Sequence, residues 1–128
     1  MLVSPAEVVA KVKATIKEYS IREAQSSMTA TTLLVDIREA TEFAQGHLPG
    51  AIHISRGLLE FEILPAIEKR GDIANAVDCD IVLYCGTGGR SALAAKSLDA
   101  MGFTNVRSMD GGIVGWAEAK LPIETPTA

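Results

Sequence analysis

The first part of the chain has the spacing of apolar residues that is typical of helices. Residues 4–7, Ser-Pro-Ala-Glu, form a helix start in which the serine can cap and the glutamate can reach back to it. The apolar residues that follow recur every three or four positions and predict an amphipathic helix to about Tyr19. Residues 20–23 repeat the capping pattern, which predicts a second, short helix to about Met28.

Further along the chain, runs of β-branched and aliphatic residues alternate with stretches of helical spacing. The runs predict strands over residues 32–36, 51–54, 80–84 and 105–109. The stretches between and after them predict helices over residues 38–45, 57–70, 91–101 and about 113–119. Pro65 should break or kink the second of these helices, because proline has no N–H group for the helical hydrogen bond.

Strands that alternate with helices predict an α/β fold, here a parallel sheet of about five strands with helices on both faces. The run over residues 80–84 is nearly all apolar, as expected for a strand that is buried on both faces. In such sheets the reactive groups lie at the carboxyl ends of the strands. The residue to consider first is therefore the one that follows this strand, Cys85.

Composition and charge narrow the class of protein. The 128 residues suffice for one domain, and a net charge of −4 argues against nucleic acid as the main partner. No apolar run approaches the ~20 residues of a membrane helix, and the N-terminus lacks the order of a secretory signal, so we expect a cytoplasmic protein without membrane contact. Two cysteines and two histidines predict neither a disulfide framework nor a metal site.

The segment after the apolar strand combines a thiol with groups that attract anions. Its residues are Cys85, Gly86, Thr87, Gly88, Gly89 and Arg90. The glycines allow positive φ angles that turn backbone N–H groups inward, and a helix expected to begin near Ser91 adds its positive end. Arg90 adds a guanidinium that can bind an oxyanion. The pKa of the Cys85 thiol should fall in this field, which makes Cys85 the candidate nucleophile and residues 86–90 the candidate substrate-binding loop.

Loop length separates two chemistries that use such a segment. Cysteine phosphatases have five residues between cysteine and arginine, whereas this chain has four, and the shorter loop resembles that of rhodaneses, where it holds a persulfide. Two flanking regions also resemble rhodanese signatures, namely residues 34–39 with 42–43 and 46–51, and residues 102–106 with 110–113 and Trp116. The motifs occur in order over about residues 20–121, so the chain resembles a single-domain, rhodanese-like sulfurtransferase.

The resemblance implies an organisation and a reaction. Residues 1–19 would form an N-terminal helical extension, residues 20–121 the rhodanese-like domain and residues 122–128 a flexible tail. Without any cofactor, Cys85 would take sulfane sulfur from a small donor such as thiosulfate, and the persulfide would pass to cyanide or a thiol. Gly86 stands where the family often has a basic residue, which bears on the choice of donor.

Other residues near strand ends are expected to support the loop rather than to react. Asp36 and Arg38 follow the first predicted strand, and Arg56 follows the second, where it could add positive potential near Cys85. Cys79 lies at the opposite end of the third strand, roughly 17 Å from Tyr84 at ~3.3 Å per residue, which argues against a resolving role.

Three alternatives fit parts of the same pattern. A persulfide carrier would receive sulfur from one protein partner and pass it to another, with small-molecule turnover only incidental. A catalytically silent recognition module is disfavoured by the intact Cys85. A phosphatase or arsenate reductase is disfavoured by the length of the loop. Acceleration of sulfur loading by a protein partner would distinguish the carrier from the enzyme.

Overall fold

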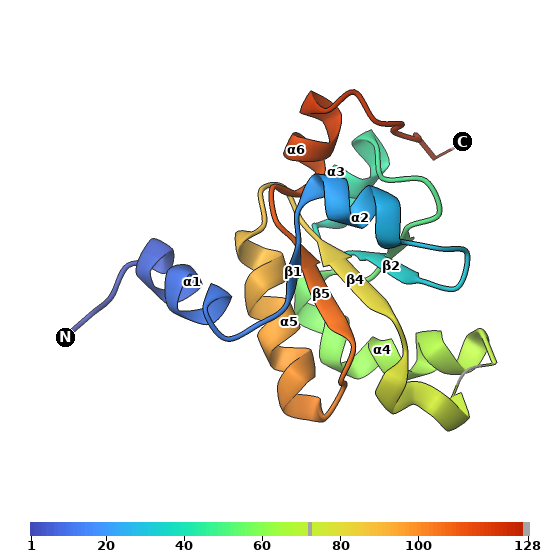
Figure 1. Cartoon of the computed structure of the whole chain (residues 1–128), viewed down its shortest axis with the longest axis horizontal. Helices are drawn as coiled ribbons and strands as arrows, with labels where there is room; N and C mark the ends of the chain where they lie inside the picture. The colour runs from blue at the N-terminus through green and yellow to red at the C-terminus, as the bar shows by residue number, and fades with distance from the viewer. Residues whose placement is uncertain (72, 127–128) are drawn as a thin grey trace.

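A computed structural model describes residues 1–71 and 73–126. In these residues the strands form one five-stranded parallel sheet, ordered β1-β5-β4-β2-β3 (Figure 1). The strands are β1 (Glu18–Tyr19), β2 (Leu33–Asp36), β3 (Ile52–His53), β4 (Ile81–Tyr84) and β5 (Val106–Met109). The predicted α/β fold is confirmed, and the apolar strand β4 lies at the centre of the sheet.

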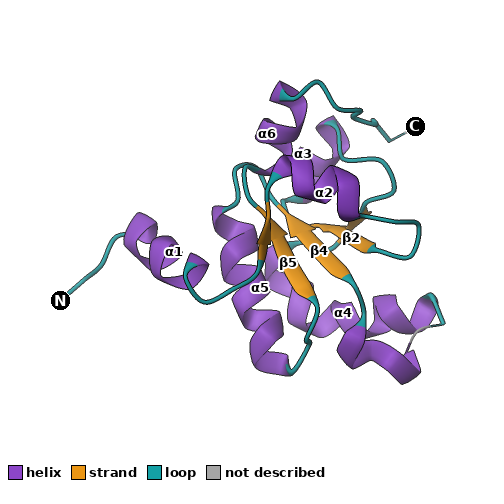
Figure 2. Cartoon of the chain, in the orientation of Figure 1, coloured by secondary structure: helices purple, strands orange, loops and turns teal. Residues whose placement is uncertain are grey.

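Helices cover both faces of the sheet (Figure 2). They are α1 (Pro5–Lys13), α2 (Ile21–Ser27), α3 (Ala40–Gln45), α4 (Leu59–Lys69), α5 (Gly89–Met101) and α6 (Gly112–Glu118), with 3₁₀ turns at Arg56–Leu58 and Ile73–Asp78. Alternate residues of each strand point to opposite faces. Leu83 of β4 therefore packs with α4 and α5, whereas Val82 packs with α2 and α6. None of the helices in the described residues has the length and hydropathy of a membrane span.

The predicted helix to Tyr19 is too long, because α1 ends at Lys13. The hydroxyl and N–H groups of Thr15 both donate to the carbonyl of Val12, at 2.9 Å each, and close the last turn. The chain then becomes extended, and Glu18–Tyr19 pairs with β5 as an edge strand that the periodicity did not reveal. This strand completes the sheet.

Pro65 does not break the predicted helix, because α4 runs through it from Leu59 to Lys69. The missing N–H group leaves the carbonyl of Phe61 without its helical donor. Phe61 is 80% exposed, so water can hydrate that carbonyl and the cost of the missing bond is small.

The predicted flexible tail is held by hydrogen bonds as far as Glu124. Its backbone N–H and carbonyl pair with those of His47 at 2.8 Å each, and the indole of Trp116 donates to the Pro122 carbonyl at 2.8 Å. Residues 127–128 of the predicted tail lie outside the described residues.

Candidate active site

Strand β4 delivers Cys85 to the carboxyl edge of the sheet, as the sequence predicts. The side chain is 1% exposed, and the loop over residues 86–88 curls around its sulfur. Of Gly86, Gly88 and Gly89, only Gly88 has a positive φ, at 110°, so the prediction of a curl built on all three glycines is wrong. Gly88 caps α5, which therefore begins at Gly89 rather than near Ser91.

Hydrogen-bond donors converge on the Cys85 sulfur. The N–H of Gly88 donates to Sγ at 3.1 Å and that of Ser91 at 3.4 Å, while the Ser91 hydroxyl lies 3.5 Å away. Burial opposes ionisation, but the Ser91 hydroxyl and the N–H groups of Ser91, Gly88 and Thr87 outweigh it and lower the pKa of the Cys85 thiol. The site therefore favours a buried thiolate, the nucleophilic form of cysteine.

A second hydroxyl supports Ser91 from the neighbouring strand. Ser108 of β5 lies 2.8 Å from Ser91, oxygen to oxygen, and both side chains are fully buried. A hydroxyl that bonds one oxygen can still donate its own proton elsewhere. When Ser108 is the donor of this pair, Ser91 keeps its own proton to donate toward the sulfur.

Arg90 forms an ion pair beside the loop. Its Nη1 donates to Glu42 Oε1 at 2.8 Å and its Nη2 to Oε2 at 3.1 Å, in a two-pronged contact between α5 and α3. The hydrogen bonds to Glu42 raise the pKa of Arg90, with a further contribution from Cys85, and they lower the pKa of Glu42 to about 2. Arg90 is therefore shared between Glu42 and the thiolate.

The N-terminus of α6 holds the backbone of the loop. The N–H groups of Ile113 and Val114 donate to the carbonyls of Cys85 and Gly86 at 2.9 and 3.0 Å. Gly112 has a φ of 56°, and a Cβ atom there would collide with the same two carbonyl oxygens. The close approach of α6 therefore requires glycine at this position.

Asp36 and Arg38 lie beneath this region in a buried network. Arg38 donates to Asp36 from Nε at 3.0 Å and from Nη2 at 2.7 Å, and Tyr84 donates from its hydroxyl at 2.7 Å. The N–H of Leu48 donates to that hydroxyl at 3.1 Å, which ties the turn after α3 to β4. Burial, followed by the hydrogen bond to Asp36, raises the pKa of Tyr84, so the phenol keeps its proton.

A comparison of the sequence with protein families identifies the domain. The family model described as the rhodanese-like domain matches residues 20–119. The chain belongs to the rhodanese-like family. The resemblance seen in the sequence motifs is thereby confirmed.

Individual proteins similar to this rhodanese-like domain include named sulfurtransferases. A sulfurtransferase of Allochromatium vinosum is 38% identical over 98 residues, 77% of this chain and 83% of that protein. The thiosulfate sulfurtransferase GlpE of Haemophilus influenzae is 36% identical over 110 residues, 85% of this chain and 95% of GlpE. A solved structure from Rhodopseudomonas palustris, of unknown function and described as a possible tyrosine phosphatase, has a TM-score of 0.80 and 29% identity, and covers 97% of this chain and 96% of that one.

The other candidate residues of the rhodanese-like domain lie in separate contacts. Arg56 pairs with Glu60 of α4, with Nη1 at 2.9 Å from Oε2, and that carboxylate also accepts from Ser97. Cys79 is half-buried just before β4, at the opposite end of that strand from Cys85. His47 lies 2.8 Å from the Leu48 carbonyl through Nδ1, within the turn after α3.

Sequence reasoning missed three side chains of the site, Glu42, Ser91 and Ser108. Glu42 belongs to the first rhodanese signature and follows the carboxyl end of β2 along the chain. These two signals could have identified it as a site residue. Ser91 directly follows Arg90 in the first turn of α5, where a hydroxyl can reach back to the loop. Ser108 is a hydroxyl residue in a buried strand, and such a residue needs a partner.

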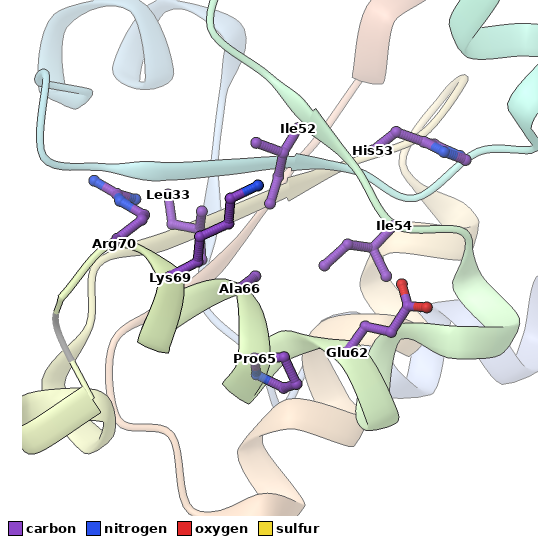
Figure 3. A pocket seen from close by; sticks show the side chains of 9 residues that line it. All are labelled: Leu33, Ile52, His53, Ile54, Glu62, Pro65, Ala66, Lys69 and Arg70. Atoms are coloured by element: carbon purple, nitrogen blue, oxygen red, sulfur yellow. The ribbon is translucent and has the colours of Figure 1, made fainter.

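A cavity of about 670 Å³ lies away from the loop, between β3 and α4 (Figure 3). Its floor is mostly apolar, with Leu33, Ile52, Ile54 and Ala66, and charged side chains of α4 stand at its margin. Within the part of the chain that the structure describes, none of residues 85–90 lines it. The chemistry of Cys85 therefore belongs to the loop and not to this cavity.

Proposed function

We propose that this domain is a sulfurtransferase that carries sulfane sulfur as a persulfide on Cys85. The observation that supports this best is the pair of N–H groups, of Gly88 and Ser91, that donate to one buried sulfur, with the Ser91 hydroxyl 3.5 Å away to donate once the thiol is ionised. Such a site stabilises an anionic sulfur and keeps it away from bulk water. The naming of relatives as sulfurtransferases supports the same reaction.

The first half of the reaction loads the cysteine. With thiosulfate as donor, an electron pair of the Cys85 thiolate forms a bond to the outer sulfur. The bond between the two sulfur atoms of thiosulfate breaks, and its electron pair leaves with sulfite. The loop N–H groups and Arg90 hold the developing negative charge, so Cys85 ends as a persulfide anion.

The second half unloads it. A thiophile, either cyanide or a cellular thiol, attacks the outer sulfur of the persulfide. The sulfur–sulfur bond breaks, its electron pair returns to Cys85, and the thiolate is restored. We propose the cytoplasm as the setting of this chemistry, because its reducing conditions keep thiol acceptors available.

The loop favours sulfur over phosphate. Four residues separate Cys85 from Arg90, and N–H groups of the loop point at Sγ itself. A phosphoryl group in line with the thiolate needs donors that surround three outer oxygens. The suggestion of phosphatase activity that accompanies the R. palustris structure is therefore not extended to this chain.

Intact mass after incubation with thiosulfate tests the proposal. The wild type should gain the mass of one sulfur atom, lose it again on addition of cyanide, and release thiocyanate. Cys85→Ser should gain no sulfur, because a serine hydroxyl stays protonated, whereas Cys79→Ser should behave as the wild type. Efficient hydrolysis of an aryl phosphate by a wild type that gains no sulfur would overturn the assignment.

A further inference from the structure

The positive charge of the active loop is matched by a fixed negative charge. Arg90 is the charged residue among residues 85–90, and both of its terminal nitrogens donate to the Glu42 carboxylate. Glu42 is held in turn by the N–H of Glu39, which donates to Oε1 at 3.0 Å. With a pKa of about 2, Glu42 is ionised throughout the working range of a cytoplasmic enzyme.

This ion pair lies at the mouth of the loop. Arg90 Nη2 is 3.4 Å from the point where a Cβ atom of Gly86 would lie, which places the guanidinium over the backbone next to Cys85. Gly86 itself brings no charge. A donor that approaches the sulfur therefore meets Arg90 together with Glu42, and not a lone guanidinium.

A second cation, Lys13, is linked to the loop through Asp110 and is neutralised too. Lys13 of α1 bonds Asp110 at 2.7 Å and Glu18 at 2.9 Å. Asp110 lies beside the loop, with Oδ1 3.4 Å from the position of a Cβ atom on Gly88. Lys13 therefore offers an approaching anion no net positive charge.

We propose that Glu42 is a positioning residue that selects sulfur donors by charge, through its clamp on Arg90. The site accepts donors with a single negative charge, such as alkyl persulfides and thiosulfonates, in preference to the dianion thiosulfate. This inference rests on the proposed sulfur transfer and names its donor class. Glu42 repels an approaching dianion, because like charges close together repel. An unpaired Arg90 would attract the dianion and offset this repulsion, but the ion pair with Glu42 cancels that attraction.

The chemistry is the same for both kinds of donor. An electron pair of the Cys85 thiolate attacks the outer sulfur, and the sulfur–sulfur bond of the donor breaks with its electron pair on the leaving group. The leaving group is sulfite from thiosulfate, methanesulfinate from methanethiosulfonate, and a thiolate from an alkyl persulfide. Methanethiosulfonate and thiosulfate are thus a matched pair, in which a methyl group replaces one charged oxygen.

The test compares kcat/KM for these two donors, with cyanide as acceptor, in the wild type and in Glu42→Gln. Freeing Arg90 should raise kcat/KM for thiosulfate by about five- to tenfold, mainly through KM, and that for methanethiosulfonate by roughly threefold or less. Glu42→Asp keeps the charge and should retain the wild-type ratio of the two donors. Glu62→Gln removes an exposed carboxylate of α4 and serves as the control, with the ratio unchanged.

Salt dependence gives a second measurement. With thiosulfate, kcat/KM of Glu42→Gln should fall steeply as ionic strength rises, while that of the wild type should change little, because only the variant attracts the dianion. An equal change for both donors in Glu42→Gln, or a loss with both, would overturn the inference and leave Glu42 as a structural support for Arg90. A wild type that forms no persulfide with either donor would instead overturn the proposed function itself.

Discussion

The Cys85 sulfur experiences two opposing effects, burial and hydrogen bonding. Burial removes water from around the thiolate, which costs free energy, and the surrounding N–H and O–H donors replace that water. Ser91 contributes both its N–H and its hydroxyl, at 3.4 and 3.5 Å. It is therefore the residue through which ionisation of Cys85 can be tested.

The first prediction concerns the titration of Cys85 in a Cys79→Ser background. The pKa should lie below the ordinary value of about 8.5, so the thiolate persists below that pH and is lost only as pH falls through the lowered pKa. Ser91→Ala should move the midpoint to higher pH, because burial remains while one donor is lost. Ultraviolet absorbance of the thiolate measures both. Ser26→Ala, an exposed serine of α2, is the control and should leave the midpoint unchanged.

The second prediction separates a buried ion pair from a more exposed one. Arg38→Met leaves the fully buried Asp36 carboxylate without its cation and should reduce the free energy of unfolding by about 3–5 kcal/mol. Arg56→Met removes the partner of Glu60, whose side chain is 31% exposed, and should cost at most about 1 kcal/mol. Urea denaturation checks both values. Equal losses of unfolding free energy in the two variants would show that the buried Asp36–Arg38 pair stabilises the fold no more than the more exposed pair does.

The residues of the site divide according to what a sequence can reveal about them. Cys85 and Arg90 could be predicted because only four residues separate them in one loop, and the loop itself follows an apolar strand. Glu42 is 48 residues from Arg90, and only the packing of α3 beside α5 brings the two together. The sequence presents Arg90 as a residue aimed at the substrate, while the fold supplies the carboxylate that shares it.

Among the elements, the short helix α6 holds the backbone of the active loop in place. Its first turn donates two N–H groups to the carbonyls of Cys85 and Gly86, and so fixes the side of the loop away from the sulfur. The remaining N–H groups of the loop are then directed toward Sγ. This role depends on Gly112, the point of closest approach.

The third prediction compares two glycines that both have positive φ. Gly50→Ala meets no atom within 4 Å and should cost only about 1 kcal/mol of stability, the strain of a left-handed alanine. Gly112→Ala adds a collision with two loop carbonyls and should cost about 3 kcal/mol or more, with loss of sulfur transfer. Thermal unfolding and persulfide loading measure the two effects. Normal loading by Gly112→Ala would show that the loop does not depend on α6.

The elements differ in how well local pattern predicts them. The strands β2, β4 and β5 and the helix α5 carry enough apolar residues to be recognised. Strand β1 has only two residues and follows a helical pattern. Its strand conformation therefore depends on pairing with β5, which the local sequence does not reveal. Pro65 shows the converse, because an exposed position lets a helix tolerate a residue that usually ends it.

On the scale of the whole molecule, the sheet places Cys85 and its loop at its carboxyl edge. Strand β4 is central, with β5 and β2 on either side, so Cys85 lies deep between two layers of helices. Helix α1, which precedes the family domain, packs along α5 and brings Val9 within 3.8 Å of a Cβ position on Gly89. The N-terminal segment thus contacts the helix that carries Arg90.

The pairing of β1 with β5 also sets an order for assembly during biosynthesis. Glu18 is made early, but its partner Ser108 emerges from the ribosome only after nearly all of the domain has been translated. Strands β2, β3 and β4 can associate before that point, whereas the first segment of the chain must wait without a partner. A nascent chain that stalls before Val106 therefore exposes one apolar edge of β4 and an unpaired N-terminal arm, both of which chaperones and proteases recognise.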